Sequence, residues 1–451
     1  MAGRWQDLYR SKLVTAEQAV APIRAGEVVY LGGNAATPRV LADALARRGE
    51  ELDGLRVAHV LLLGEDPFAK PPAAGRIQHL SWFVGPADRR ALLQDRGEYV
   101  PCHLSEIPRL IRSGIPKIDT ALLMTAPPDR NGMLSLGVEV LASLAASECA
   151  DRVVVQVNER MPRVLGNSFV HVSEVDAIVE ESHELPELLP EPPSEDERRI
   201  AQHVVGLIPE RATLQLGIGG IPNAVVSLLE GRDDLGPPAE MISDGVMYGF
   251  ERGVVTGRHK TRHRNKIVTS FALGSRAFYD WLHENNAVEA HPCDHTNNPV
   301  VAAQNERLVA INSAISVNLT GQVNSDSIGY RIYSGVGGQV DFIRAASLSP
   351  GGRPIIALPS TARRGAVSRI VPRLAEGAGV VTSRADVHWV ATEHGAADLY
   401  GLSIAERVAA LIALAHPRFR PELEEAVRTV DQFFRTYEEG DPDDPRDERR
   451  R

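Results

Sequence analysis

Short apolar runs alternate along the chain with segments of helical periodicity. Runs rich in β-branched residues occupy 153–157, 266–269 and 354–358. Residues 404–412 instead place their apolar side chains at the spacing of one helix face. Such alternation is typical of α/β proteins with mainly parallel sheets. We therefore predict an α/β fold.

One pattern occurs twice in the chain. The apolar run 28–31 precedes a glycine pair and a helix that opens near Pro38. In the second half, the run 213–216 precedes a glycine-rich turn at 217–220 and a helix that opens near Pro222. The repetition predicts two related α/β halves.

The predicted boundary between the halves lies in a segment rich in proline and acidic residues. Residues 185–197 disfavour both helix and sheet, because proline lacks the backbone donor that both need. We predict an N-terminal domain at 1–190 and a C-terminal domain at 191–437. Residues 438–451 lack apolar periodicity, which predicts a disordered tail.

Composition excludes some classes of partner. The chain carries 49 basic and 59 acidic side chains, for a net charge of -10, and only 5% of its residues are aromatic. Nucleic-acid binding is therefore not expected.

The longest apolar runs are too short to span a membrane, and charged residues occur where a signal peptide would be apolar. The three cysteines are isolated, which fits a reducing cytoplasm.

The glycine-rich turn at 215–220 lies between a predicted strand and a predicted helix. Gly219 and Gly220 leave backbone N–H groups open toward a ligand, and the helix dipole adds positive potential there. A phosphate or an oxyanion would fit. A dinucleotide fingerprint would need glycine where the chain has Pro222, and no GK[ST] motif follows. A tight crossover without a ligand remains an alternative.

A second glycine cluster, at 333–338, also precedes a predicted helix. Two such turns indicate a long or polyanionic ligand that is held mainly by backbone groups. Two unrelated turns are the alternative.

Glu240 is a candidate nucleophile. It follows Pro237 and Pro238 and precedes the apolar pair 241–242. Partial desolvation at the start of an apolar strand would raise the basicity of its carboxylate and favour attack on an acyl group. The alternative is an exposed glutamate ahead of a strand.

The region 283–295 contains His283, His291, Cys293 and His295, but the spacing matches no zinc pattern and no HExxH occurs. We therefore predict no metal site. No GxSxG motif supports a serine nucleophile either. The basic loop 258–266 is either a solvated connection or a screen for ligand phosphates.

Together these motifs resemble the acetyl-CoA hydrolase/transferase family, most closely its 4-hydroxybutyrate and butyryl-CoA:acetate CoA-transferase branch. The resemblance extends from Trp5 to Leu423. It is most specific in five segments, which are 214–224, 240–245, 324–329, 334–342 and 392–395. It implies two similar open α/β domains of the class I CoA-transferase type, with the active site in the cleft between them.

The resemblance also implies a mechanism and a site. Glu240 matches the family glutamate that attacks an acyl-CoA thioester to form an anhydride and then a glutamyl-CoA thioester. The positions that match CoA contacts are Gln215, Leu216, Gly217, Ile218, Gly219, Gly220, Ile315, Gly335, Gly337 and Gly338. Members of the branch often carry histidine where this chain has Gly33, so Gly33 and Asn34 are expected beside the acyl pocket.

We therefore expect a cytoplasmic, homodimeric acyl-CoA:carboxylate CoA-transferase for short-chain acids. Coenzyme A would be a co-substrate, with no tightly bound cofactor. An acyl-CoA hydrolase is the nearest alternative, because water can replace the acceptor acid. A CoA-binding protein without turnover is a remote one, since a pure binder would not need Glu240.

Overall fold

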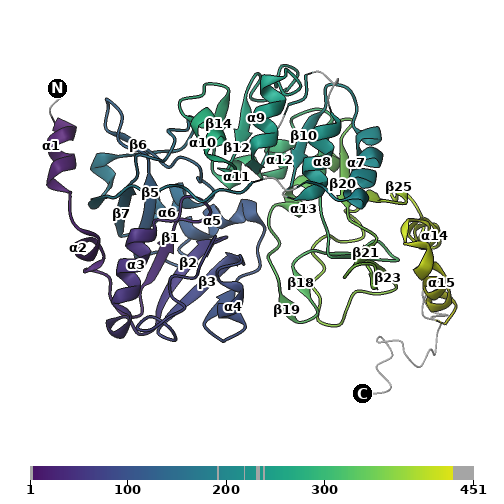
Figure 1. The fold of residues 1–451 in the computed structure, drawn as a ribbon, viewed down its shortest axis with the longest axis horizontal. Coiled ribbons are helices and arrows are strands. Elements are labelled where there is room, and N and C mark those ends of the chain that lie inside the picture. Colours follow the sequence, from purple (N-terminus) through teal and green to yellow (C-terminus); the bar gives the residue numbers. More distant parts are fainter. Residues whose placement is uncertain (1–3, 190–191, 218, 230–233, 237–238, 430–451) are drawn as a thin grey trace.

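The computed structural model describes residues 4–189, 192–217, 219–229, 234–236 and 239–429. Its larger sheet has seven strands that are all parallel, as the alternating pattern predicted (Figure 1). In spatial order the strands are β4 (Gly97–Tyr99), β3 (Ile77–Phe83), β2 (Leu55–Val60), β1 (Val28–Leu31), β5 (Thr120–Thr125), β7 (Arg152–Val157) and β9 (Ala177–Glu180).

Both faces of this sheet are buried. Successive side chains of a strand point to opposite faces, so Val28 and Tyr30 belong to one hydrophobic cluster and Val29 and Leu31 to another. This explains why strands of a parallel sheet appear as continuous apolar runs. The helices of this half are α1 (Arg4–Ser11), α2 (Ala16–Val20), α3 (Arg39–Arg47), α4 (Arg89–Leu92), α5 (Ile107–Arg112) and α6 (Ser143–Cys149), and the short strands β6 (Met133–Ser135) and β8 (Phe169–His171) form a separate pair.

The second sheet has five strands, of which the last is antiparallel. Its order is β10 (Thr213–Leu216), β15 (Leu308–Asn312), β20 (Arg353–Ala357), β24 (Trp389–Thr392) and β25 (Gly395–Asp398). Its helices are α7 (Glu195–Leu207), α8 (Gly220–Leu228), α13 (Gln339–Leu348), α14 (Ile404–Leu414) and α15 (Arg420–Thr429). The repeated strand, glycine turn and helix is present in both halves, but β1 is central in its sheet and β10 is at an edge.

The segment between β10 and β15, two neighbouring strands of the second sheet, packs against the first half of the chain. It contains β11 (Met241–Ile242), β12 (Ile267–Thr269), β13 (Phe271–Ala272), β14 (Val288–Ala290), α9 (Asp244–Glu251), α10 (Arg276–Leu282), α11 (Cys293–Thr296) and α12 (Pro299–Ala302). Its apolar side chains, including Ile242 and Phe271, join the same cluster as Tyr30 of β1. The strand that follows Glu240 therefore lies against the first half, while the chain before and after it builds the second sheet.

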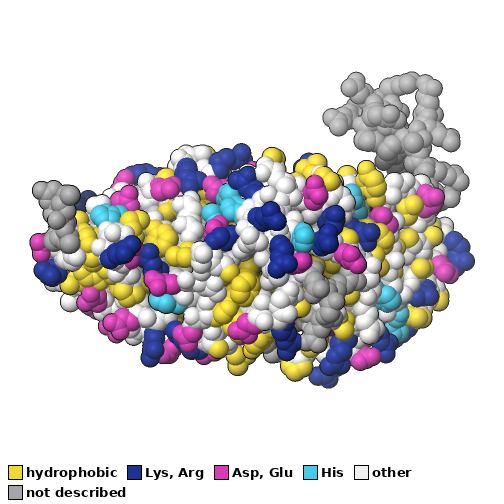
Figure 2. Space-filling model, turned by 90° about the horizontal axis from the view of Figure 1, so that it is seen from above, with side chains coloured by type: hydrophobic (Ala, Val, Ile, Leu, Met, Phe, Trp, Pro, Cys, Tyr) yellow, Lys and Arg dark blue, Asp and Glu magenta, His cyan; other side chains and the backbone are white. Residues whose placement is uncertain are grey.

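Smaller strands complete the second half. They are β16 (Ser316–Asn318), β17 (Val323–Asn324), β18 (Ser327–Ile328), β19 (Arg331–Ile332), β21 (Thr361–Ala362), β22 (Val367–Ser368) and β23 (Ile370–Val371). Among the described helices, none is long and apolar enough to cross a membrane. On the face shown in Figure 2, acidic and basic side chains are interspersed. The predicted tail at 438–451 lies outside the described residues, and the division at residue 190 stays a prediction.

Candidate active site

The backbone fixes Glu240 directly before β11. Its carbonyl oxygen accepts hydrogen bonds from the N–H groups of Ser270 and Phe271, at 3.0 and 3.1 Å. Its side chain is held as well, because Nδ2 of Asn297 donates to Oε2 of Glu240 at 2.7 Å. Glu240 is neither fully buried nor exposed. The alternative of a freely exposed glutamate is therefore wrong.

Asn297 is buried and its amide has a defined orientation. It follows the last residue of α11, and the Thr296 hydroxyl donates to its Oδ1 at 2.9 Å. The Asn297 NH₂ group is thereby turned toward the Glu240 carboxylate. Nothing in the sequence marks this residue, since an asparagine after a one-turn helix carries no recognisable signal.

The environment makes the Glu240 carboxyl less acidic than a free one. Burial raises its pKa from 4.5 to about 7, the Asn297 hydrogen bond opposes this shift, and the negative charge of Asp341 adds to it. Asp341 lies on α13 and accepts two hydrogen bonds from Ser105, one from the hydroxyl at 2.8 Å and one from the N–H at 3.1 Å. A carboxylate of this kind combines higher basicity with poor solvation, which favours nucleophilic attack.

The second glycine turn meets Glu240 directly. A Cβ atom on Gly338 would lie 1.9 Å from Oε2 of Glu240 and 2.3 Å from Nδ2 of Asn297. The φ of Gly338 is -93°, which any residue can adopt, so space rather than backbone conformation requires glycine here. The structure thus brings together Glu240 and one of the predicted CoA contacts.

The first half of the chain holds this turn in place. The Val84 N–H donates to the Ser334 carbonyl at 3.1 Å, and the Leu104 N–H donates to the Gly337 carbonyl at 3.0 Å. Gly335 and Gly337 both pack against Phe83, at the end of β3. The second glycine turn is therefore part of the contact between the two halves.

Ile315 lies near the same turn. It follows β15, and its N–H donates to the Asn324 carbonyl at 2.9 Å. The Ser325 hydroxyl, next in the chain, donates to the Ser313 carbonyl at 3.4 Å, and the Ser334 hydroxyl donates to the Ser325 carbonyl at 3.2 Å. These bonds join the Ile315 loop to the start of the second glycine turn.

The first glycine turn lines a cavity instead. Gln215 is buried, and its Oε1 accepts from Nδ2 of Asn312 at 3.1 Å. A cavity of about 260 Å³ is bordered by turn residues Leu216, Gly217, Gly219 and Gly220, and by Met241 and Ser243 just after Glu240. The cavity therefore adjoins β11, the strand that begins directly after Glu240. Ile218 lies outside the described residues.

The N-terminus of α8 already has a carboxylate beside it. A Cβ atom on Gly220 would lie 2.1 Å from Oε1 of Glu197, whose other oxygen caps its own helix through Ser194. Gly219 is exposed and has a φ of +124°. A ligand oxygen at this turn would have to share the helix terminus with Glu197 or displace it, a constraint that the sequence did not predict.

Gly33 and Asn34 are buried in the turn that follows β1. A Cβ atom on Gly33 would lie 2.0 Å from the Val60 carbonyl oxygen, so no side chain fits here with this backbone. Asn34 has a φ of +52°, and its buried side-chain amide has no partner within the described protein. An unpaired buried amide is costly unless water or a ligand satisfies it. Asn34 is thus available as a polar contact.

Glu139 connects this region to Glu240. Its buried carboxylate accepts from the Ser143 hydroxyl at 2.5 Å and from the N–H of Gly33. Burial raises its pKa to about 7. Its backbone bridges to Phe271, whose N–H donates to the Glu240 carbonyl. A chain of contacts through Glu139 and Phe271 therefore links Gly33 to the backbone of Glu240.

Comparison with known proteins places these features in a family. Residues 3–190 match the acetyl-CoA hydrolase/transferase N-terminal domain, and residues 274–427 match the C-terminal domain. The chain is 44% identical to the 4-hydroxybutyrate coenzyme A transferase of Clostridium kluyveri, over 93% of this chain and 98% of that protein. It is 36% identical to the butyryl-CoA:acetate CoA-transferase of Anaerostipes caccae, over 93% of this chain and 96% of the relative.

Solved structures show the same fold. RipA from Yersinia pestis superposes with a TM-score of 0.89 and 38% identity, over 94% of this chain and 98% of that one. The 4-hydroxybutyrate CoA-transferase from Porphyromonas gingivalis superposes with a TM-score of 0.80 and 38% identity, over 94% of this chain and 100% of the other. The expected family and fold class are therefore confirmed.

Proposed function

Because the chain belongs to the acetyl-CoA hydrolase/transferase family, we propose that it is a CoA-transferase that moves coenzyme A between short-chain carboxylic acids. The activities for which its relatives are named, on 4-hydroxybutyrate and on butyryl-CoA with acetate, support this substrate class. The observation that carries the proposal is the setting of Glu240, whose carboxylate is held by Asn297 and lies against Gly338.

In the proposed first step, Oε1 of Glu240 attacks the thioester carbonyl, since Oε2 is held by Asn297. The carbon–sulfur bond breaks and coenzyme A leaves as a thiolate, which produces an acyl-glutamyl anhydride. The thiolate then attacks Cδ of Glu240 and releases the acyl group as a carboxylate. The enzyme now carries a glutamyl-CoA thioester.

With the second carboxylic acid as acceptor, the same reactions run in the opposite direction. Its carboxylate attacks the glutamyl thioester and releases the CoA thiolate. The thiolate then attacks the acyl carbonyl of the new anhydride and regenerates Glu240. Each step passes through a tetrahedral oxyanion, and a backbone donor aimed at such an oxyanion contributes about 2.7–4 kcal/mol. The two glycine turns are the proposed donors, and remote contacts with CoA would press the carbonyl against Glu240.

Transfer and hydrolysis are separated by one experiment. The protein is incubated with butyryl-CoA and each of a panel of acids, including acetate, 4-hydroxybutyrate and succinate, while new thioesters and free CoA are measured together. We expect a new acyl-CoA with at least one acid, formed at least about tenfold faster than free CoA. Release of free CoA at the same rate with and without acids would instead establish a hydrolase.

The pH dependence follows from the raised pKa of Glu240. Only the deprotonated carboxylate can attack, so kcat/KM for acyl-CoA should rise with pH, with a midpoint near the pKa of about 7. At pH 6 about one-tenth of Glu240 is ionised, so the rate should be about tenfold below its plateau. Asn297→Ala removes the bond that favours the carboxylate and should move the midpoint upward. A profile that is flat from pH 5.5 to 8.5 would contradict this assignment.

We also propose that the protein works in the cytoplasm as a homodimer. The three cysteines, Cys102, Cys149 and Cys293, are all free thiols, which suits a reducing compartment. The dimer rests on the family resemblance, and analytical ultracentrifugation would test it.

A further inference from the structure

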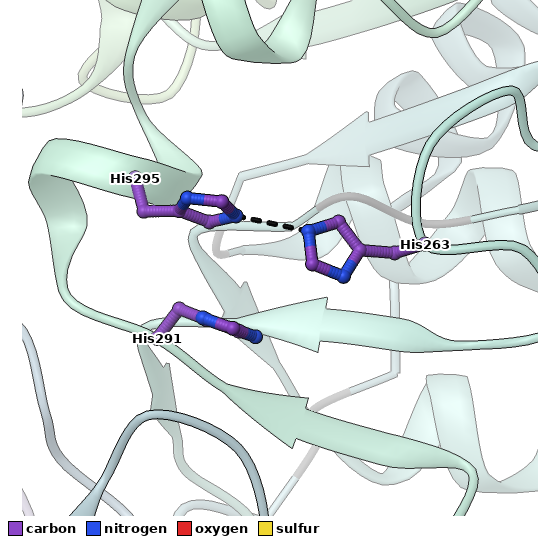
Figure 3. Close-up of side chains that lie close together, drawn as sticks. All are labelled: His263, His291 and His295. Carbon is purple, nitrogen blue, oxygen red and sulfur yellow. Dashed lines mark hydrogen bonds between the residues drawn. The ribbon is translucent and has the colours of Figure 1, made fainter.

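Three histidines from separate segments meet near the active site. His263 lies in the loop before β12, His291 directly follows β14, and His295 is in α11 (Figure 3). One ring nitrogen from each can be chosen so that all three lie within 4.8 Å of one another. Nε2 of His263 and Nε2 of His295 are 2.9 Å apart. The three rings thus point into one small space.

This spacing is close to that of a metal site. Zinc binds imidazole nitrogens at about 2.0–2.1 Å, which places the nitrogens of a tetrahedral site about 3.3 Å apart. The observed separations bracket this value, so small ring movements would complete three ligands. His263 and His291 have side chains that are 22% and 15% exposed, so a water molecule can reach a fourth position.

A carboxylate lies where a metal site would need one. Oε2 of Glu289 is 3.0 Å from Nδ1 of His263 and 3.4 Å from Nε2 of His291. Histidine ligands commonly donate their second N–H to a carboxylate, which fixes the ring and makes the ligating nitrogen more basic. With Nδ1 engaged by Glu289, Nε2 of His263 remains directed at His295.

The charges around the cluster are mixed. Glu289 and Asp294 supply negative charge, whereas Arg262 and Lys266 are basic neighbours. Burial lowers the pKa of His295 to about 4, so its ring is neutral at pH 7, as a metal ligand must be. The geometry of the rings, not this shift, is the basis of the inference.

We propose that His263, His291 and His295 bind one divalent transition-metal ion of the zinc type. The sequence predicted no metal site, because the spacings within 283–295 match no zinc pattern. His263 lies outside that region, and only the fold brings it to His291 and His295. The metal would join the loop 258–266 to α11, and the residue after α11 is Asn297, which donates to Glu240. Its role would therefore be structural, with the glutamate chemistry unchanged.

Zinc binding to the full-length protein tests this proposal. Protein treated with EDTA and dialysed is titrated with ZnCl₂ by calorimetry. We expect about one zinc per chain, and a rise in Tm of at least about 3 °C with excess zinc. The variants His263→Gln and His295→Gln should lose both effects, while His283→Gln, an exposed histidine outside the cluster, should keep them. Equal binding by all four proteins, or no binding by the unaltered one, would overturn the proposal.

A second measurement does not depend on how the variants fold. X-ray absorption at the zinc edge of the unaltered protein should show about three imidazole nitrogens at about 2.0 Å. A shell dominated by sulfur, or one that lacks imidazole, would overturn the site. Neither measurement uses CoA transfer, so failure here would leave the proposed function standing.

Discussion

Replacement of Glu240 by glutamine should reduce CoA transfer by at least about a thousandfold, which is the scale of effect when a covalent nucleophile is removed. Glutamine keeps the size of the side chain, and its carbonyl oxygen can still accept the Asn297 bond. The expected loss is therefore chemical rather than structural. Steady-state rates of acyl-CoA exchange would measure it, and a KM for acyl-CoA within a fewfold of the original would show that binding is intact.

Glu251→Gln is the matched control. Glu251 is an exposed acid at the end of α9, so this substitution makes the same change in charge outside the site. Its rate should stay within about twofold of the original enzyme, as is usual for surface positions. If E240Q retained more than a tenth of the original rate, Glu240 would not be the nucleophile.

The second large effect is expected at Gly338. In Gly338→Ala, the new methyl group would overlap Oε2 of Glu240 and Nδ2 of Asn297. The carboxylate must then move, and a displacement of about 1 Å commonly reduces an enzymatic rate about a hundredfold. We expect kcat to fall by that order, while Tm changes by only a few degrees because the displaced groups are side-chain ends.

Gly206→Ala provides the comparison. Gly206 is an exposed position in α7, where a Cβ atom would have open space around it. Alanine favours helix more than glycine does, so this variant should be as stable as the original or slightly more so, with full activity. A G338A enzyme as active as G206A would show that the second glycine turn does not constrain the Glu240 carboxylate.

Local sequence patterns predicted the strands better than their partners. The runs 153–157 and 354–358 correspond to β7 and β20, which lie in the two large sheets. The similar run 266–269 corresponds to β12, which pairs only with β14 among the described strands. Apolar periodicity reports burial of a segment, whereas the choice of partner depends on distant parts of the chain, so the sequence predicted the element but not its sheet.

The same limit applies to the site. Glu240 and the second glycine turn were identified because they lie within recognisable motifs, and the structure brings Gly338 to Glu240. Asn297 and Glu139 had no local signal, since an isolated polar residue acquires its role only when the fold buries it. His263 was considered only as part of a basic loop, because its nearness to His295 is created by tertiary packing.

The most direct test is mass spectrometry of the protein after incubation with acyl-CoA in the absence of an acceptor acid. We expect CoA to become attached as a thioester to the peptide that contains Glu240. Added carboxylate should remove it, and E240Q should form none. Continued CoA transfer without any CoA on this peptide, or with CoA attached at another residue, would contradict it.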